Sequence, residues 1–424
     1  MVTNGATYMN QVVSNPVGGA ARLQFWSFAL AVLAIWMAFA VFMGLPIFQH
    51  GDTDQQTLQA LAWRNGHANL DWNDPNIEAN KNWLELAQFN GHVYNSFPAT
   101  PTLIELPLTM IWGDRTPNTM VMLLFCWAAF LLGYGILHHY TKDRVLSIFV
   151  AAGFFFGTQI LYASLEATVH YQGHIYAVFF SLLAIFIAIK ARRAWQLIFA
   201  GLAIGLAIGC RPFQFCLIPV IVALAQNRFP LWKVLIYGFI GLVPVGAALA
   251  WYNWLRFGNI TEFGHIYLPL HRVYHRGPQF GLRYFGFNAS HWLTELPSVD
   301  KATGLLNFNG YGSAFWLTSP FTVLALWYFV KKDVPILERL VVGLCYVAMQ
   351  FGLLLHESNG WFQFGYRYLI DIVPLFLFMF ARAYKRLGYW MIPIGIWAII
   401  INVYGVYWKD FSPLGYPHEA MIFY

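Results

Sequence analysis

The spacing of the charged residues constrains this chain most, because it leaves long stretches without any Lys, Arg, Asp or Glu. Most of these stretches reach the length of about 20 residues that a helix needs to cross a bilayer core. Only 10% of the residues are charged, whereas a soluble domain carries about 25%. The sequence therefore predicts an all-α, polytopic membrane protein. The charge-free stretches are 23–51, 116–141, 145–165, 167–189, 194–210, 212–227, 234–255, 302–330, 340–356 and 387–408.

Short loops rich in Lys and Arg predict the sidedness of the spans, because such loops favour the cytoplasm. Eleven spans place every short basic cluster inside, with the N-terminus cytoplasmic and the C-terminus outside. This topology puts 14 of the 25 Lys and Arg inside, but only 3 of the 19 Asp and Glu. The basic balance is thus a topology signal. The predicted spans are 24–46, 118–138, 145–163, 174–190, 194–210, 213–226, 234–255, 313–330, 339–356, 365–381 and 387–407.

The apolar segment Pro101–Gly113 does not fit among these spans, because it has only 13 residues and carries Pro107 in its middle. At the helical rise of 1.5 Å per residue it covers about 20 Å, well short of a core of about 30 Å. We expect an interfacial or re-entrant helix on the outer face.

Two outer segments are too long to be simple connectors within the single membrane domain expected for residues 1–424. They are the first extracytoplasmic loop, 49–117, and the second large loop, 256–312. Loops of this length usually carry function or a small fold of their own. The working face is therefore predicted to be extracytoplasmic.

The first outer loop opens with two carboxylates in the string GDTDQQTLQALAWRNGH. Asp52 and Asp54 come at the membrane surface, before a pattern typical of a helix that lies in the interface. A lower dielectric there favours a role as general base. The alternative for each is a helix N-cap, a position that Asp prefers.

Aromatic and proline residues follow in NGHVYNSFPATPTLIELPLTMIWG. Tyr94, Phe97 and Pro98 would enter the bilayer surface together, where they could frame a lipid chain. Anchoring by an aromatic belt explains the same residues. No GxxxxGK[ST] or GxGxxG motif offers a nucleotide cradle, so a group-transfer donor would already be on the outer face.

The order of these motifs resembles the GT-C superfamily of integral membrane glycosyltransferases. The pattern D-x3-L-x-A-L begins at Asp54 and is followed by G-x-x-Y-x-x-F-P-A-x-P-x-L-x-x-L-P from Gly91. The stretches GLAIGCRPFQFCLIP and FGYRYLIDIVP also look like segments of bacterial members. The resemblance implies a polyprenyl-phosphate-linked sugar donor, inversion at the anomeric carbon and a place in a bacterial inner membrane. It puts the catalytic carboxylate on Asp54, with Asp52 as the fallback.

One departure from the family concerns the donor phosphate. The lipid A aminoarabinose and protein mannosyl branches have a Lys or His beside paired prolines, where this chain reads Ser96-Phe97-Pro98-Ala99. The resemblance therefore leaves open which group there contacts the phosphate.

Charged residues at the edges of spans supply further candidates. Arg211 interrupts two apolar stretches and would need a partner, for which a phosphate would suit its planar fork of donors. Snorkelling to the headgroups is the alternative. Arg367 and Asp371 are four residues apart, hence on one helix face, where they could form a salt bridge or a phosphate site.

Glu166, His170 and His174 recur at four-residue spacing in SLEATVHYQGHIY. A continuous helix would stack them on one side, and a His pair at this spacing can hold a divalent metal. Gly173 and the loop position weaken that geometry. Metal binding, substrate or phosphate contact and a structural role all remain open.

The second large loop mixes arginine, histidine and aromatic residues, with Arg272 as the candidate for binding phosphate or anionic lipid. Its neighbours of the same kinds are Arg256, Arg276, Arg283, His265, His271 and His275. A nucleic-acid partner is not expected on this side of the membrane.

Together these features predict a membrane hexosyl- or pentosyltransferase with a polyprenyl-phosphate sugar donor and a glycan or lipid acceptor, embedded in membrane lipids. No cofactor is assigned, and a divalent metal stays open. The alternatives are a lipid or solute transporter or flippase, because charges near spans also mark solute pathways, and a lipid-linked polysaccharide ligase or polymerase.

Overall fold

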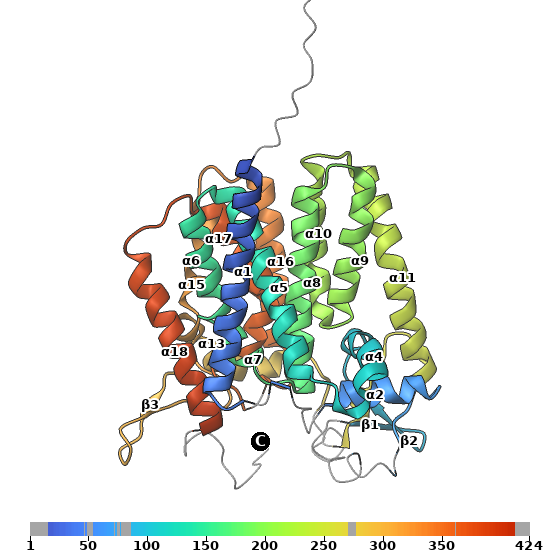
Figure 1. Ribbon diagram of the computed structural model, residues 1–424. Helices are drawn as coiled ribbons and strands as arrows, with labels where there is room; N and C mark the ends of the chain where they lie inside the picture. The colour runs from blue at the N-terminus through green and yellow to red at the C-terminus, as the bar shows by residue number, and fades with distance from the viewer. Residues whose placement is uncertain are drawn as a thin grey trace, which may run out of the picture.

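The computed structural model describes residues 16–45, 47–48, 54–71, 73, 77, 86–269, 277–360 and 362–411. Long helices run side by side along one direction and form a bundle (Figure 1). Six helices are long and apolar enough to cross a membrane by length and composition. The all-α, polytopic character predicted from the sequence is confirmed. The six helices are α1 (Pro16–Phe42), α5 (Asn118–Thr141), α8 (Val169–Lys190), α11 (Leu231–Phe257), α16 (Ile336–Leu354) and α18 (Met391–Phe411).

Shorter helical pieces lie in the other five predicted spans. Several of them begin at a proline in the first turn, where its missing N–H costs no helical hydrogen bond. The pieces are α6 (Arg144–Phe155), η2 (Ala194–Gln196) with α9 (Leu197–Ile208), η3 (Pro212–Leu217) with α10 (Ile218–Gln226), α14 (Phe315–Thr318) with α15 (Pro320–Ala325) and η6 (Leu326–Val330), and η7 (Arg367–Ile372) with α17 (Val373–Ala383).

The predicted span 145–163 differs from the structure, because α6 ends at Phe155 and a separate short helix, α7 (Ile160–Ala163), follows. Thr158 occupies the break. Its Oγ1 donates to the Phe154 carbonyl at 2.7 Å and accepts from the Ile160 N–H at 3.3 Å. The side chain thus replaces hydrogen bonds that the interrupted helix would make, which allows irregular backbone inside the bundle.

The helices differ in how much of their surface the protein itself covers. All of α17 except Arg382 is buried, and α8 is largely buried as well. In contrast, α11 and α16 expose large apolar side chains such as Phe239 and Leu344, which are 65% and 70% exposed. The centre of the bundle is therefore α8 and α17, and the outer helices present the apolar surface expected of lipid contact.

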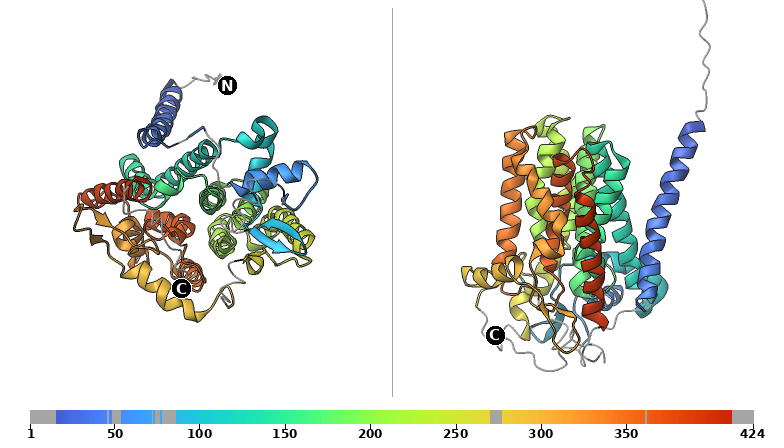
Figure 2. Two further views of the ribbon diagram at one scale, coloured as in Figure 1. Left: turned by 90° about the horizontal axis from the view of Figure 1, so that it is seen from below. Right: turned by 90° about the vertical axis from the view of Figure 1, so that its left-hand side faces the viewer.

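Helix α1 lies at the edge of the bundle (Figure 2). Two indole N–H groups tie it to its neighbours. Trp127 of α5 donates to the Ala29 carbonyl at 2.8 Å, and Trp36 of α1 donates to Ser164 Oγ at 3.0 Å.

Small elements cover the end of the bundle where α18 finishes (Figure 1). Residues of the first predicted loop form α2 (Gln55–Arg64), the antiparallel hairpin β1 (Leu86–Phe89) and β2 (His92–Asn95), α4 (Thr100–Trp112) and η1 (Gly113–Arg115). Residues of the second form η4 (His265–Tyr267), η5 (Leu282–Tyr284), α13 (Phe285–Leu293) and the two-residue strands β3 (Ser298–Val299) and β4 (Leu306–Asn307). The expected helix over Pro101–Gly113 is α4.

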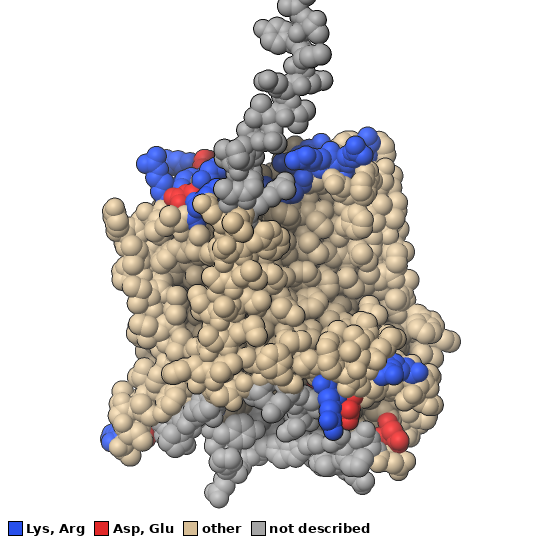
Figure 3. Space-filling view, viewed as in Figure 1, with Lys and Arg blue, Asp and Glu red and all other residues tan. Residues whose placement is uncertain are grey.

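Lys and Arg gather at the opposite end of the bundle, where α1 begins, and a broad band without charged side chains separates the two ends on the face shown (Figure 3). The exposed basic residues of the short connections are Lys142, Arg144, Lys190, Arg192, Arg193, Arg228, Lys332, Lys385 and Arg386.

Close packing of α9 against α11 depends on glycines. A Cβ on Gly201 would lie 2.0 Å from the Gly238 carbonyl oxygen, and one on Gly241 would lie 1.9 Å from the Ile198 carbonyl oxygen. Both neighbours are backbone atoms, so the helices would have to move apart. Gly201 and Gly241 therefore form a helix-packing surface between α9 and α11.

We predict that Gly201→Ala destabilises the protein by about 1–3 kcal/mol, the usual cost of overpacking. The measurement is the thermal unfolding midpoint in detergent. Gly246→Ala on α11 is the matched control, because its Cβ would meet nothing within 4 Å. Equal midpoints for the two variants would contradict close packing at Gly201.

Candidate functional site

Two buried polar clusters lie beside the first turns of α8. The Asp54 cluster consists of Asp54, Gln56, Thr57 and Gln172, and the Asp371 cluster consists of Asp371, His174, Arg211 and Gln214. Gln172 and His174 are two residues apart on α8, about 200° around the helix axis. The two clusters therefore contact nearly opposite sides of one helix.

Asp54 is 1% exposed and is the N-cap of α2. Its Oδ1 accepts from the Gln56 N–H at 3.0 Å and from Gln172 Nε2 at 3.2 Å, and its Oδ2 accepts from Thr57 Oγ1 at 2.5 Å. Three donors and the positive end of a helix stabilise the ionised carboxylate. Asp54 is therefore the helix N-cap that the sequence allowed as an alternative. Its carboxylate also places a negative charge beside α8.

The fallback candidate, Asp52, lies outside the described residues.

Three further elements fix the first turn of α2. Gln56 Oε1 accepts from Asn95 Nδ2 of β2 at 3.2 Å and from Thr102 Oγ1 of α4. Thr57 Oγ1 accepts from Asn118 Nδ2 of α5 at 3.2 Å. The hairpin, the short helix and the bundle thus all position the residues around Asp54.

Asp371 is fully buried, and its carboxylate contacts both Arg211 and His174. Arg211 approaches its Oδ2 with Nε at 3.0 Å and Nη2 at 2.9 Å, and His174 Nδ1 lies 2.7 Å from its Oδ1. Because an ionised carboxylate can only accept, the proton of that histidine contact is on Nδ1. Gln214 Nε2 donates to the Asp371 carbonyl oxygen at 2.9 Å. The partner that Arg211 was expected to need is therefore Asp371.

Arg367 is not placed relative to Asp371 as an α-helix would place it. Both lie in the 3₁₀ helix η7, where residues four apart are separated by about 120° around the axis instead of about 40°. The Arg367 guanidinium lies 5.5 Å from the ring centre of Tyr171 and 5.7 Å from that of Tyr368. Arg211 lies 5.2 Å from the same Tyr368 ring. Two guanidinium groups therefore share one aromatic side chain.

Glu166, His170 and His174 do not share one continuous helix, because α8 begins at Val169 and leaves Glu166 outside it. His170 and His174 both lie in α8, about one turn apart. Glu166 forms an ion pair with Lys409 of α18, a residue that the sequence did not single out. The His170 ring contacts Phe97 edge to face at 5.4 Å between centroids. Within the described part of the chain, no group of three His, Cys, Asp or Glu could hold a metal ion.

Tyr94 lies in β2 among apolar residues of the hairpin region. It contacts Phe257 edge to face at 5.3 Å between centroids and is 7% exposed. Burial raises the pKa of Tyr94 and the nearby charge of Arg256 lowers it in part. Arg256 donates to the Asn95 carbonyl at 2.6 Å, so this arginine helps hold β2. Arg272 lies outside the described residues.

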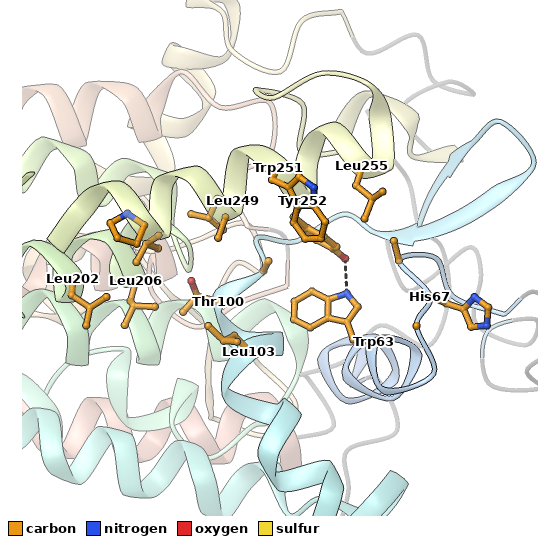
Figure 4. A pocket seen from close by; sticks show the side chains of 16 residues that line it. Trp63, His67, Thr100, Leu103, Leu202, Leu206, Leu249, Trp251, Tyr252 and Leu255 are labelled. Atoms are coloured by element: carbon orange, nitrogen blue, oxygen red, sulfur yellow. Dashed lines mark hydrogen bonds between the residues drawn. The ribbon is translucent and has the colours of Figure 1, made fainter. Parts of the chain in front are cut away.

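An apolar groove of about 720 Å³ opens between α2, α4, α9 and α11 (Figure 4). We call it the Trp63 groove. Trp63 Nε1 donates to the Tyr252 hydroxyl at 3.3 Å across it. Its wall at Thr100 touches the segment that carries Arg211, because the Thr100 N–H donates to the Gly209 carbonyl at 3.0 Å. The apolar side chains that line it include Leu103, Leu202, Leu206, Leu249, Trp251 and Leu255.

Comparison with known proteins finds similarity in structure alone. No protein family and no curated protein sequence matches the chain. The crystal structure of ArnT from Cupriavidus metallidurans bound to undecaprenyl phosphate is similar, with a TM-score of 0.54 and 10% identity over 88% of this chain and 63% of that one. The apo oligosaccharyltransferase of Archaeoglobus fulgidus gives a TM-score of 0.44 and 12% identity over 91% and 58%. The chain thus spans less than two thirds of the length of either protein.

We predict that Asp371→Asn destabilises the protein by about 3 kcal/mol, because it leaves Arg211 without its buried counter-charge. Urea or thermal unfolding in detergent measures the loss. Asp333→Asn is the control, since Asp333 is 58% exposed and lies 3.8 Å from Lys331; such surface pairs contribute about 1 kcal/mol or less. A loss no larger than the control's would show that the Asp371 cluster is not a stabilising contact.

Proposed function

We propose, on the premise of the GT-C fold that the chain shares with ArnT, that this protein is an integral membrane glycosyltransferase. It would move a sugar from a polyprenyl-phosphate-linked donor to a glycan or lipid acceptor at the extracytoplasmic face of a bacterial inner membrane. The observation that carries the proposal is the placement of a buried carboxylate and a pair of guanidinium groups on opposite sides of the first turns of α8.

Asp54 is the group proposed to act on the acceptor. As the acceptor oxygen bonds to the anomeric carbon, its proton would pass to the Asp54 carboxylate. The bond between that carbon and the donor phosphate oxygen breaks in the same step, and the electron pair leaves with the polyprenyl phosphate. The Asp54 carboxylate suits this role because its hydrogen bonds favour the ionised form.

Arg211 and Arg367 are proposed to stabilise the leaving phosphate, with His170 as a further candidate. Lys409 approaches the same Tyr171 ring as Arg367. Fixed positive charge placed where negative charge grows is usually the largest catalytic contribution. Asp371 would act as a positioning residue that orients Arg211 through its buried contacts. Among the residues outside the described part, Arg272 stays a candidate for the same phosphate.

The opposition of the two clusters bears on stereochemistry. In a single displacement the nucleophile and the leaving group occupy opposite sides of the reacting carbon. A substrate lying across the N-terminal end of α8 would meet Asp54 on one side and Arg211 on the other. This placement supports the inverting course that the resemblance implies.

The charge distribution supports the proposed placement in the membrane. The basic connections of the bundle lie at one end and α2, α4 and the hairpin at the other (Figures 1 and 3). We infer eleven crossings, with the basic end in the cytoplasm. The Trp63 groove, lined by leucine and tryptophan side chains, supports a substrate that carries a lipid chain.

We predict that Asp54→Asn lowers sugar transfer by at least about 100-fold while the protein stays folded. Asn is as good an N-cap as Asp, so this change separates the cap from the base. The assay uses reconstituted vesicles, polyprenyl-phosphate sugars and a mixed acceptor pool. Full activity in Asp54→Asn with loss in Asp52→Ala would move the base to Asp52, and solute flux without sugar transfer would overturn the enzyme proposal.

We predict that Arg367→Gln weakens the binding of a polyprenyl phosphate about tenfold or more, because a charged hydrogen-bond donor is lost. Arg367→Lys should be intermediate, since Lys keeps the charge but not the planar fork. Quenching of tryptophan fluorescence in detergent follows the binding. Arg115→Gln, an exposed arginine of η1, is the control; an equal effect of both changes would remove Arg367 from the phosphate site.

A further inference from the structure

A second carboxyl lies buried near Asp54, and the function proposed above does not use it. Glu105 is in α4 and is 0% exposed. It shares one face of that helix with Thr102 and Thr109, at spacings of three and four residues. This face packs against α2, because Thr102 donates to Gln56 and Arg64 Nη1 donates to the Thr109 carbonyl at 2.5 Å.

One face of α8 donates hydrogen bonds to both carboxyls. Gln172 Nε2 donates to Asp54 Oδ1 at 3.2 Å, and the Tyr176 hydroxyl donates to Glu105 Oε1 at 3.1 Å. Residues 172 and 176 are four apart, hence about one turn along the same side of the helix. Asp54 and Glu105 are therefore neighbours along α8, held by two adjacent donors.

The two carboxyls have unequal surroundings. Asp54 accepts from a backbone N–H, a hydroxyl and an amide at the start of a helix, all of which favour its ionised form. Glu105 accepts from one tyrosine hydroxyl, and its Oε2 is buried without a hydrogen-bond partner. A buried ionised oxygen without a partner is costly, whereas the protonated acid is far less so.

The charged and titratable groups on the elements around Glu105 do not offset this inequality. Burial raises the pKa of Glu105 well above its usual range, the charge of Asp54 raises it further, and the Tyr176 hydrogen bond lowers it in part. The groups on the packed elements are Asp54 and Arg64 of α2, Tyr176 of α8, and the exposed Asp114 and Arg115 of η1.

We propose that Glu105 holds a proton in the folded protein, so that the two buried carboxyls carry one negative charge and Asp54 bears it. Paired acids whose environments differ divide into a neutral and an ionised member in this way. Glu105 is then a positioning residue that sets the charge of the site. What Asp54 does with that charge rests on the function proposed above, but the proton on Glu105 does not.

Infrared spectroscopy tests the proton directly. In an alkyl-glycoside detergent without ester lipids at neutral pH, we expect the carbonyl stretch of a protonated carboxylic acid in the wild type. Glu105→Gln should remove this band, and Asp54→Asn should leave it. Absence of the band in the wild type, or its survival in Glu105→Gln, would overturn the inference.

Stability against pH gives a second test with a fixed sign. The folded pKa of Glu105 lies above the value of 4.5 of the free group, so the folded state binds more protons than the unfolded state between the two values. The wild type should therefore lose stability relative to Glu105→Gln as pH rises from about 4.5 through the folded pKa. Thermal unfolding midpoints over this range measure the difference.

Asp114→Asn is the matched control for the second test, because Asp114 is an exposed carboxyl just beyond the same helix. Its midpoint should follow the wild type at every pH. A wild-type midpoint that keeps a constant difference from that of Glu105→Gln, or that rises relative to it as pH rises, would contradict a proton on Glu105. Neither test uses sugar transfer, so failure of the proposed function and failure of this inference are separate results.

Discussion

The carboxylate of Asp371 joins three segments that are far apart in the sequence. It lies in η7, accepts from Arg211 at the start of η3, and contacts His174 in α8. Both η segments are 3₁₀ helices that precede a bundle helix, and irregular backbone at membrane depth is tolerated only inside protein. Gly173 lets the η3 segment approach, since its Cβ would lie 3.3 Å from the Cys210 carbonyl. This buried contact therefore fixes both the bundle and the direction of Arg211.

The rest of the site follows from α8 as a common support. Gln172 and Tyr176 point to the two buried carboxyls, while His174 points to Asp371 on the other side of the helix. A negative and a positive region are thereby held apart by one rigid element. Such preorganisation costs no reorganisation during a reaction in which charge separates.

The sequence predicted the all-α, polytopic character, because lipid excludes charge and long charge-free stretches therefore indicate apolar helices. It did not predict the breaks within spans, such as the one between α6 and α7. It also predicted a carboxylate at the start of α2, because helix capping depends on residues that are close together in the sequence. It did not reveal that Asp371 pairs with Arg211, because the two are 160 residues apart and no local pattern encodes the contact. The 3₁₀ form of η7 was not predicted either, because the spacing of Arg367 and Asp371 was interpreted with α-helical turns.

Glu105 and Lys409 were missed for different reasons. Lys409 sits at the end of the last span, where a basic residue is unremarkable, and only the fold brings it to Glu166. Glu105 left a signal, because it is a carboxylate inside the apolar run TLIELPL. A carboxylate in a short apolar helix either faces water or is buried with polar partners. The sequence alone therefore marks Glu105 as a candidate buried acid.

The polarity of α4 shows what kind of interior the protein has at this end. Its buried face carries Thr102, Glu105 and Thr109, whereas Met110 and Ile111 on the outer face are 65% and 71% exposed. A helix of a soluble protein has the reverse arrangement. An apolar exterior around a polar interior fits a helix that contacts lipid on one side and the polar residues of α2 on the other.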